Sequence, residues 1–342
     1  MKRVTVHDVA AEAGVSLATV DRVLNGRVGV SPATIARVKT AVERLNYRRD
    51  VFAASLATGR DYRFQFLVPA GNANTFIGNL GQAVQEAAER LADQRIFLSL
   101  IPYEAFAEAS LARKLAAIDP ATVKGVAVVA IDSPSVRQAI DGLVARGVAV
   151  VTVVSDAVPS HRARCVAIDN ICAGRVAGTL IGRFLGGRKG KVALIFGSLS
   201  LHDHAERRIG FEQIMRRDFP HLQILAAEEG RDDSGLTKPL AARLIAEHPD
   251  LIGLYSLGAG NRGIIEALEE SGRAHSIVTI GHELTPHSRM ALISGTFDAI
   301  IHQNVASEVT AAVNTLKALC DKEPATSEPN IPIDIYFRDN LP

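Results

Sequence analysis

Residues 6–25 read Val6-His-Asp-Val-Ala-Ala-Glu-Ala-Gly-Val-Ser-Leu-Ala-Thr-Val-Asp-Arg-Val-Leu-Asn25, a pattern of two short helices joined by a tight turn. We expect helices over Val6–Ala13 and Leu17–Asn25, because Gly14 can adopt the left-handed backbone that ends a helix and Ser16 can cap the next one. The apolar residues fall where two crossed helices would touch. Four side chains are then left facing outward: Leu17, Ala18, Asp21 and Arg22.

A third helix is expected after Ser31 and Pro32, which suit the cap and the first helical position. Its apolar stripe comprises Ile35, Val38, Val42 and Leu45. Three such helices can bury one small core, so the N-terminal segment is predicted to be a small all-α head.

The charge of the chain is concentrated in this head. Residues 1–60 carry ten Lys or Arg and five Asp or Glu, whereas the remainder carries 28 and 32, so that the whole chain has a formal net charge of +1. A helix-turn-helix places its second helix in the major groove, and basic side chains bind the phosphates around it. A three-helix bundle with an ordinary solvated basic face is the alternative; the coincidence of turn and charge favours DNA binding.

The remainder of the chain shows a regular alternation of strand and helix patterns. Strands are expected over 63–69, 96–101, 125–131, 149–154, 191–196, 223–227, 251–256, 276–281, 298–302 and 333–337. Helices are expected over 78–92, 109–118, 135–146, 173–185, 205–218, 236–247, 262–271, 286–293 and 307–319. Such alternation predicts parallel sheets with helices on both faces. Two runs of similar size indicate two doubly wound subdomains, with a ligand cleft between them at the carboxyl ends of the strands.

Composition narrows the class of protein further. The chain has 342 residues, enough for two or three domains, and lacks the run of about 18 apolar residues that a membrane span needs. Cys165, Cys172 and Cys320 match no zinc-site spacing, so reduced thiols and a cytoplasmic, nucleoid-associated protein are expected. We expect neither a metal nor a cofactor, and no catalytic cluster.

The N-terminal motif resembles the DNA-binding head of the lactose-repressor/galactose-repressor family. The resemblance rests on Val4-Thr-Val-His-Asp-Val-Ala-Ala-Glu-Ala-Gly-Val-Ser16 and Ala18-Thr-Val-Asp-Arg-Val-Leu-Asn25, and the chain also ends in the family's closing Arg338-Asp-Asn-Leu-Pro342. It implies a head over 1–47, a hinge helix or linker over 48–60, and an effector-binding and dimerisation domain over 61–342 with the type I periplasmic-binding-protein fold. Periplasmic proteins of this fold are excluded, because they lack the head and carry a signal peptide.

The resemblance also implies roles for individual residues of the head and hinge. Leu17, Ala18 and Arg22 match positions that touch base edges, and Arg22 can donate two hydrogen bonds to guanine. The matching backbone-contact positions are Thr5, Ser16, Thr19, Asn25, Ser31 and Thr34. Ala53 belongs to the hinge, and Leu56 matches the leucine that wedges into the minor groove. The hinge departs from the family pattern at Arg48-Arg49-Asp50, which leaves its folding and operator preference open.

The same resemblance implies an effector site for a sugar or polyol in the cleft. The residues expected to bind it are Asn74, Phe76, Asp156, His204, Arg207, Asn261, Glu283 and Gln303. The segment Asp203–Arg208 departs from the family, whose cleft arginine aligns near Ala205, so His204 or Arg207 is expected to substitute. Each of these polar residues has an ordinary alternative as a loop cap or a surface charge.

One glycine motif favours a different class of protein. Gly258, Gly260 and Gly263 have the spacing of a dinucleotide-binding turn, with Glu283 near the position of the expected acid. An NAD-binding oxidoreductase is therefore one alternative, and a sugar sensor acting through a protein partner is another. The sequence favours a regulator, most simply a repressor, that binds a pseudo-palindromic double-stranded operator as a homodimer. It leaves open induction against corepression, and dimer against tetramer.

Overall fold

The computed structural model describes residues 4–24, 29–45, 60–70, 74–323 and 331–342. The sequence-predicted Asn25, Ala53 and Leu56, and the hinge residues 48–59, lie outside the described residues. The chain divides into two compact units. One unit holds Met1–Asp61 and Asp93–Arg95, and its helical part is the head; the other holds Tyr62–Ala92 and Ile96–Pro342 and is called the body.

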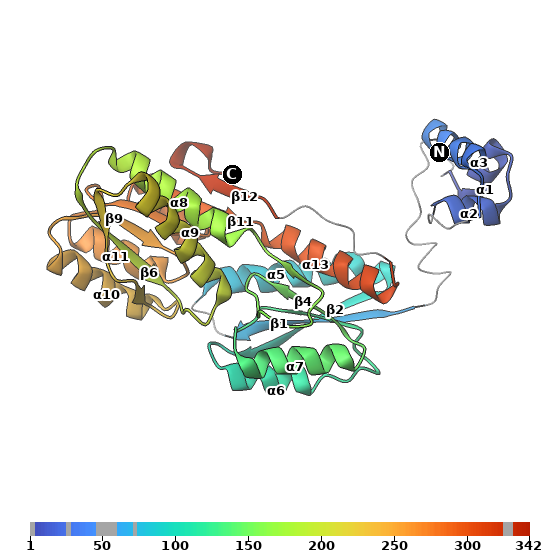
Figure 1. The fold of residues 1–342 in the computed structure, drawn as a ribbon, viewed down its shortest axis with the longest axis horizontal. Coiled ribbons are helices and arrows are strands. Elements are labelled where there is room, and N and C mark those ends of the chain that lie inside the picture. The colour runs from blue at the N-terminus through green and yellow to red at the C-terminus, as the bar shows by residue number, and fades with distance from the viewer. Residues whose placement is uncertain (1–3, 25–28, 46–59, 71–73, 324–330) are drawn as a thin grey trace. The chain divides into compact units, whose positions relative to one another are not determined.

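The head consists of the three expected helices, α1 (Val6–Ala13), α2 (Leu17–Leu24) and α3 (Pro32–Arg44) (Figure 1). Gly14 ends α1 in the left-handed conformation, with φ 62°. The small core contains Val9, Ala10, Ala13, Val20, Val38 and Ala41. The helix-turn-helix and its third helix are confirmed, and each helix begins at a hydroxyl residue, because hydroxyl oxygens satisfy backbone N–H groups that a helix start leaves unpaired.

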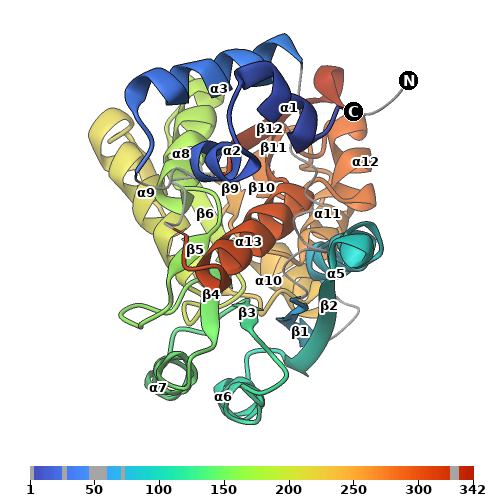
Figure 2. The ribbon, with the colours of Figure 1, turned by 90° about the vertical axis from the view of Figure 1, so that its right-hand side faces the viewer.

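The first subdomain of the body has a five-stranded parallel sheet in the order β2-β1-β3-β4-β5. Its strands are β1 (Tyr62–Ala70), β2 (Ile96–Glu104), β3 (Gly125–Val128), β4 (Ala149–Val153) and β5 (Arg164–Val166). Its helices are α5 (Thr75–Leu91), η1 (Ala92–Gln94), α6 (Glu108–Ala116), α7 (Pro134–Ala145) and α13 (Val305–Cys320). Figures 1 and 2 show α6 and α7 on one face of the sheet and α5 and α13 on the other.

The second subdomain has a seven-stranded sheet in the order β12-β11-β10-β9-β6-β7, with β8 beside β6. Its strands are β6 (Gly190–Phe196), β7 (Leu222–Ile224), β8 (Glu228–Glu229), β9 (Leu251–Ser256), β10 (Val278–His282), β11 (Ala299–Gln303) and β12 (Ile333–Tyr336). Its helices are α8 (Asn170–Leu185), α9 (His202–Asp218), α10 (Ser234–Glu247), α11 (Asn261–Glu270), α12 (Pro286–Ser294) and η2 (Arg338–Asn340). All pairings are parallel except that of β12 with β11.

Both sheets are buried on two faces, as expected for doubly wound subdomains. Along β6, Val192 and Leu194 pack in the core under α8 and α9, whereas Ala193 and Ile195 pack in the core with α10. The period of two thus assigns successive residues to opposite layers. The predicted fold class, a small helical head followed by two α/β subdomains, is confirmed.

The structure differs from the sequence prediction at several element boundaries. Helix α5 begins at Thr75 rather than at residue 78, because the Asn74 side chain accepts hydrogen bonds from the backbone N–H groups of Phe76 and Ile77. The short strands β5 and β8 were not predicted from the sequence. Strand β8 spans Glu228–Glu229, which has no apolar alternation to indicate a strand.

The chain passes between the two subdomains at three places. Residues 167–169 lead from β5 to α8, Asn304 leads from β11 to α13, and the segment after α13 leads back to β12. The first and third connections lie side by side, since Ile168 and Ile331 form an isolated parallel bridge.

Candidate functional site

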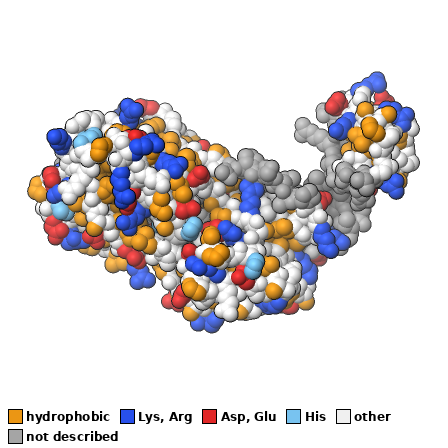
Figure 3. Space-filling model, in the orientation of Figure 1, with side chains coloured by type: hydrophobic (Ala, Val, Ile, Leu, Met, Phe, Trp, Pro, Cys, Tyr) orange, Lys and Arg blue, Asp and Glu red, His pale blue; other side chains and the backbone are white. Residues whose placement is uncertain are grey.

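The outward face of α2 carries the residues predicted to read DNA. Leu17, Ala18, Asp21 and Arg22 are all exposed, and the Leu17 side chain is 39% exposed although it is a large hydrophobic residue. Figure 3 shows hydrophobic and basic side chains together on the displayed face of the head. The structure therefore leaves the predicted base-reading side chains available to a partner.

The hydroxyl residues predicted to contact the DNA backbone gather at the three helix N-termini. Thr5 forms a capping box with Asp8, whose backbone N–H donates to Thr5 Oγ1 at 3.4 Å. The hydroxyls of Ser16 and Thr19 lie 2.9 Å apart at the start of α2, and those of Ser31 and Thr34 lie 2.9 Å apart at the start of α3. Helix N-termini attract phosphate oxygens, so these hydroxyls can serve both as caps and as backbone contacts.

A cavity of about 410 Å³ lies between the two subdomains of the body. It opens at the carboxyl ends of the parallel strands, where the loops of both sheets meet. Its lining comprises Pro69, Ala70, Asn74, Phe76, Ile77, Tyr103, Ala105, Phe106, Val129, Ile131, Val154, Ser155, Leu201, Asp203, His204, Arg207, Arg231, Asp232, Asp233, Leu236, Gly258, Ala259, Glu283 and Gln303. Six sequence-predicted effector residues lie in this lining: Asn74, Phe76, His204, Arg207, Glu283 and Gln303.

Two predicted effector residues, Asp156 and Asn261, are not part of this lining. The Asp156 carboxylate instead pairs with Arg162 and accepts a 2.7 Å hydrogen bond from Thr152. Burial alone would raise the pKa of Asp156, but the hydrogen bonds from Arg162 and Thr152 outweigh it and lower this pKa. Asp156 faces a smaller neighbouring cavity of about 230 Å³.

Asn261 is turned away from the main cavity because the sheet uses both ends of its amide. Its Oδ1 accepts a 2.6 Å hydrogen bond from Ser256, and its Nδ2 donates to the backbone oxygen of His282 at 2.8 Å. Asn261 therefore ties β9 to β10 from the first residue of α11. For both residues the sequence indicated the correct strand end but not the direction of the side chain.

Helix α9 carries the departure from the family pattern, and it delivers two side chains to the cavity. Arg207 is 2% exposed; its Nε donates to Asn170 Oδ1 at 2.8 Å and its Nη1 to the Leu257 carbonyl at 2.7 Å. His204 is also buried, and its Nε2 lies 3.7 Å from Asp203 Oδ2. Both expected substitutes for the family's arginine thus reach the cavity.

Helix α9 is held against α8 by glycines. A Cβ on Gly174 of α8 would lie 1.9 Å from the carbonyl oxygen of Arg207, and a Cβ on Gly210 of α9 would lie 2.0 Å from that of Ile171. Only glycine permits this approach of the two backbones. The position of Arg207 is therefore fixed by the backbone beneath it as well as by its own hydrogen bonds.

Glu283 and Gln303 form the opposite side of the polar lining. Gln303 Nε2 donates to Glu283 Oε1 at 2.7 Å, while Glu283 Oε2 lies 3.1 Å from His302 Nδ1. Glu283 has a left-handed backbone, with φ 70°, which turns its side chain into the cavity directly after β10. Gln303 Oε1 has no hydrogen-bond partner among the described residues.

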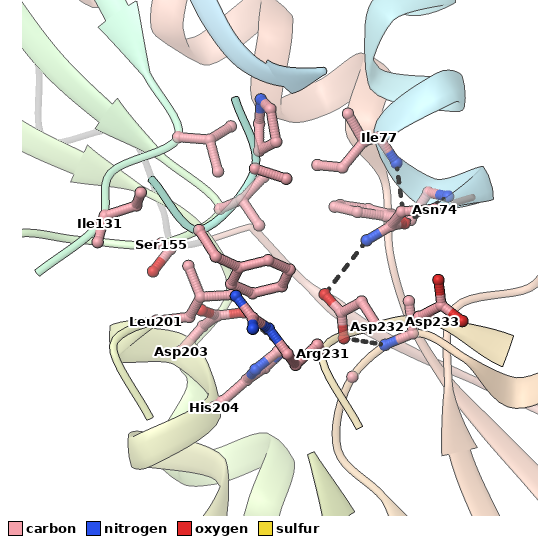
Figure 4. A pocket seen from close by; sticks show the side chains of 18 of the residues that line it. Asn74, Ile77, Ile131, Ser155, Leu201, Asp203, His204, Arg231, Asp232 and Asp233 are labelled. Carbon is pink, nitrogen blue, oxygen red and sulfur yellow. Dashed lines mark hydrogen bonds and ion pairs between the residues drawn. The ribbon is translucent and has the colours of Figure 1, made fainter. Parts of the chain in front are cut away.

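Asp232 is the main cavity residue that sequence reasoning missed. Its Oδ1 accepts from the backbone N–H of Ala259 at 2.9 Å, and its Oδ2 accepts from Asn74 Nδ2 at 3.3 Å across the cleft (Figure 4). Burial raises the pKa of Asp232, and the nearby Asp203 adds to this while His204 opposes it. The one sequence signal was its position just before α10, which Asp233 caps.

Three other lining residues that sequence reasoning missed are Tyr103, Phe106 and Arg231. The Arg231 guanidinium lies over the Phe106 ring at 5.6 Å, and this contact joins the two subdomains at the mouth of the cavity. The Tyr103 hydroxyl donates to the Val129 carbonyl at 2.6 Å, so its ring is held against the cavity wall. Nothing in the alternation of β2 indicated these roles.

The glycine motif serves packing in this structure. A Cβ on Gly263 would lie 2.2 Å from the Ser234 carbonyl, and Gly260, the residue before α11, has φ 90°. The backbone N–H of Ala259 already donates to the Asp232 carboxylate, which would also repel a pyrophosphate. The dinucleotide interpretation is not favoured.

Two further features bear on the class of protein. Among the described residues, no cluster of His, Cys, Asp and Glu is suited to a metal ion, and no helix there has the length and apolarity to cross a membrane. Cys165 and Cys172 are free thiols, and burial raises the pKa of Cys165 to about 12.

Comparison with known proteins agrees with both units. Residues 5–50 match the family model of bacterial regulatory proteins of the lacI family, and residues 64–324 match that of the periplasmic binding protein domain. The chain is 27% identical over 277 residues to the HTH-type transcriptional regulator GalS of Salmonella typhimurium, covering 79% of this chain and 77% of that protein. It is 39% identical over 85 residues to catabolite control protein A of Priestia megaterium, a match that spans 25% of each chain.

Solved structures share the fold of the body. The glucose-galactose binding protein GanP from Geobacillus stearothermophilus superposes with a TM-score of 0.75 at 23% identity, covering 83% of this chain and 99% of that one. A solute binding protein from Burkholderia graminis, in complex with D-arabinose, gives a TM-score of 0.75 at 19% identity, covering 82% and 96%. These likenesses show the fold.

Proposed function

This chain belongs to the lacI family of bacterial regulators, with a periplasmic-binding-protein-like body, and we propose that it is a transcriptional repressor controlled by a small sugar or polyol. The observation that carries the proposal is that an exposed helix with the predicted base-reading side chains occurs in one unit and a cavity lined by both subdomains occurs in the other. The regulator GalS, similar over most of both chains, supports the regulatory role. The binding proteins of the same fold whose titles name glucose, galactose or arabinose support the class of effector.

The proposed mechanism follows from the arrangement of the body. A homodimer would hold two heads on the two halves of a pseudo-palindromic operator in the cytoplasm. A ligand in the cavity contacts both subdomains, so it favours the arrangement in which they bind it best and shifts the population toward it. The heads then gain or lose the spacing that the operator requires.

Catalysis is not part of this proposal. Glu283 is held by hydrogen-bonding contacts to Gln303 and His302. A sugar sensor that acts through a protein partner would need no exposed basic reader such as Arg22, so the head favours DNA as the partner.

Replacing Arg22 tests the proposal. An operator is first selected from random DNA with the full chain, and affinity is then measured for single-base variants at fixed salt. Arg22→Ala should weaken binding by about 1–3 kcal/mol and relax preference at one position of each half-site. Arg37→Ala, which removes an exposed arginine of α3, is the control and should not change base preference. Failure to select any operator would contradict the proposed function.

A further inference from the structure

We propose that the effector is an uncharged molecule with a hydroxylated end and an apolar end, such as an alkyl or aryl glycoside. This inference rests on the proposed function and specifies its ligand. The observation behind it is that the two subdomains contribute chemically different halves of the cavity. The hydroxylated end belongs on the second subdomain and the apolar end on the first.

The first subdomain contributes an almost wholly apolar wall. Its lining includes Phe76, Phe106, Val129, Ile131 and Val154. Such a wall cannot satisfy the hydroxyl groups of a free sugar, which would lose hydrogen bonds to water without replacing them.

The few polar side chains in this wall are already engaged. Asn74 Oδ1 caps α5 while its Nδ2 donates to Asp232. The Tyr103 hydroxyl donates to a backbone carbonyl, and Ser155 Oγ accepts from the backbone N–H of His202 at 3.0 Å. Each of these side chains already makes a hydrogen bond within the protein, so the wall offers mainly apolar contact area. Figure 4 shows Ile77 and Ile131 among the side chains that line it.

The second subdomain contributes a polar floor with groups in need of partners. Asp203 Oδ1, Arg207 Nη2 and Gln303 Oε1 have no hydrogen-bond partner among the described residues. Their side chains belong to residues that are 4%, 2% and 1% exposed, respectively. Buried polar groups are normally paired, so these three atoms point to a ligand that pairs them.

The identity of these atoms selects hydroxyl groups over anions. Two of them are acceptors and one is a donor, and a hydroxyl can both donate and accept. A phosphate or carboxylate would bring only acceptors into a lining that already holds the buried carboxyls of Asp203, Asp232 and Glu283. A protonated amine would lie against the Arg207 guanidinium. Neutral hydroxyls are the chemistry that the floor fits.

The proposal is tested by calorimetric titration of the full chain. The probes are phenyl glycosides of glucose, galactose, xylose and arabinose in both anomeric forms, the four parent sugars, and the two hexose 6-phosphates. Burying a phenyl ring on the apolar wall should make at least one glycoside bind about tenfold or more tightly than its parent sugar. Neither phosphate should bind.

Variants on the wall locate the apolar end. Phe106→Ala should lower the affinity for the glycoside by about tenfold and change the affinity for its parent sugar by no more than about twofold. Phe97→Ala is the matched control, because Phe97 is an exposed aromatic of the same subdomain outside the cavity lining. Thermal unfolding of each variant checks that it is folded.

The outcomes separate this inference from the proposed function. A parent sugar that binds as tightly as its glycoside, or a phosphate that binds, overturns the inference and leaves a small-molecule-controlled regulator standing. If no compound binds, both the inference and the sugar or polyol effector fall, while operator selection still decides DNA binding. If Phe106→Ala lowered the affinities for the glycoside and for its parent sugar equally, the placement of the apolar end on this wall would also be overturned.

Discussion

The two subdomains enclose one cavity but meet the ligand with opposite chemistry. The first offers an apolar wall, whereas the second buries Asp203, Arg207 and Asp232 at its lining. Buried charges cost stability unless partners and surrounding structure hold them in place. In the second subdomain, Arg207 is held by two hydrogen bonds and by the close packing of α8 against α9. The second subdomain thus holds both the buried polar groups of the lining and the contacts that fix them.

The largest effect is expected from removing the hydrogen bonds of Arg207. Arg207→Met would leave the buried Asp203, Asn170 Oδ1 and the Leu257 carbonyl without their partner, and should lower the free energy of unfolding by about 3–5 kcal/mol. Urea unfolding measures it. Arg208→Met, which removes a half-exposed arginine paired with Glu212 on the same helix, should cost about 1 kcal/mol or less. If both variants lost the same free energy of unfolding, the buried contacts of Arg207 would stabilise the fold no more than a surface ion pair does.

A smaller effect is expected from the helix pair. Gly174→Ala places a Cβ against the Arg207 carbonyl and should lower the free energy of unfolding by about 1–3 kcal/mol. Effector binding should also weaken, because α9 must shift. Gly142→Ala in α7 of the first subdomain meets nothing within 4 Å and should stabilise by about 0.5–1 kcal/mol. Thermal unfolding of both variants compares the halves directly. A neutral Gly174→Ala would show that α8 and α9 can separate freely.

The smallest effect is expected from Glu308, a buried acid of the mainly apolar first subdomain. Glu308, in the first turn of α13, is 0% exposed, and neither carboxyl oxygen has a partner among the described residues. Burial raises its pKa well above the ordinary value, and Glu283 adds to the shift. The folded state therefore keeps a proton that the unfolded state loses, so stability falls as pH rises above the pKa of an ordinary glutamate.

Glu308→Gln removes this proton linkage. The variant should be more stable than the parent by about 1 kcal/mol or more at pH 8, with little difference at pH 4. Chemical unfolding across this pH range measures the two profiles. Glu89→Gln, on the exposed face of α5, is the control and should leave the profile unchanged. If Glu308→Gln changed the free energy of unfolding by the same amount at every pH, the cause would be packing rather than ionisation.

Local signals predicted the head and the alternation of strands and helices in the body well. Ser16, Gly14 and Ser31 act within a few residues of their own helices, so the sequence alone carries their geometry. Buried parallel strands such as Leu251–Ser256 are continuous apolar runs and are equally easy to predict. The short β8 was missed, because its pairing with β6 depends on residues far away in the chain.

The site was predicted by position but not by direction. Asn74 follows β1 and Gln303 ends β11, both at the edge where the loops of a parallel sheet meet, and both reach the cavity. Asp156 follows such a strand too, yet Arg162 draws its carboxylate away. Asp232 was missed because it follows the two-residue strand β8, whose end cannot be located from an apolar pattern. Which loop side chain turns inward depends on its tertiary partners, and no pattern along the chain encodes them.

The hydrogen bond from Arg207 to Asn170 has a consequence for how strongly the protein responds to its ligand. Asn170 is the first residue of α8, directly after the connection 167–169 between the subdomains. A guanidinium drawn toward a ligand must therefore stretch this bond or turn the start of α8 with it. The contact links the cavity to the residue at which the chain enters the second subdomain. Changes at Asn170 would then tune the amplitude of the response while leaving its chemical selectivity to the cavity.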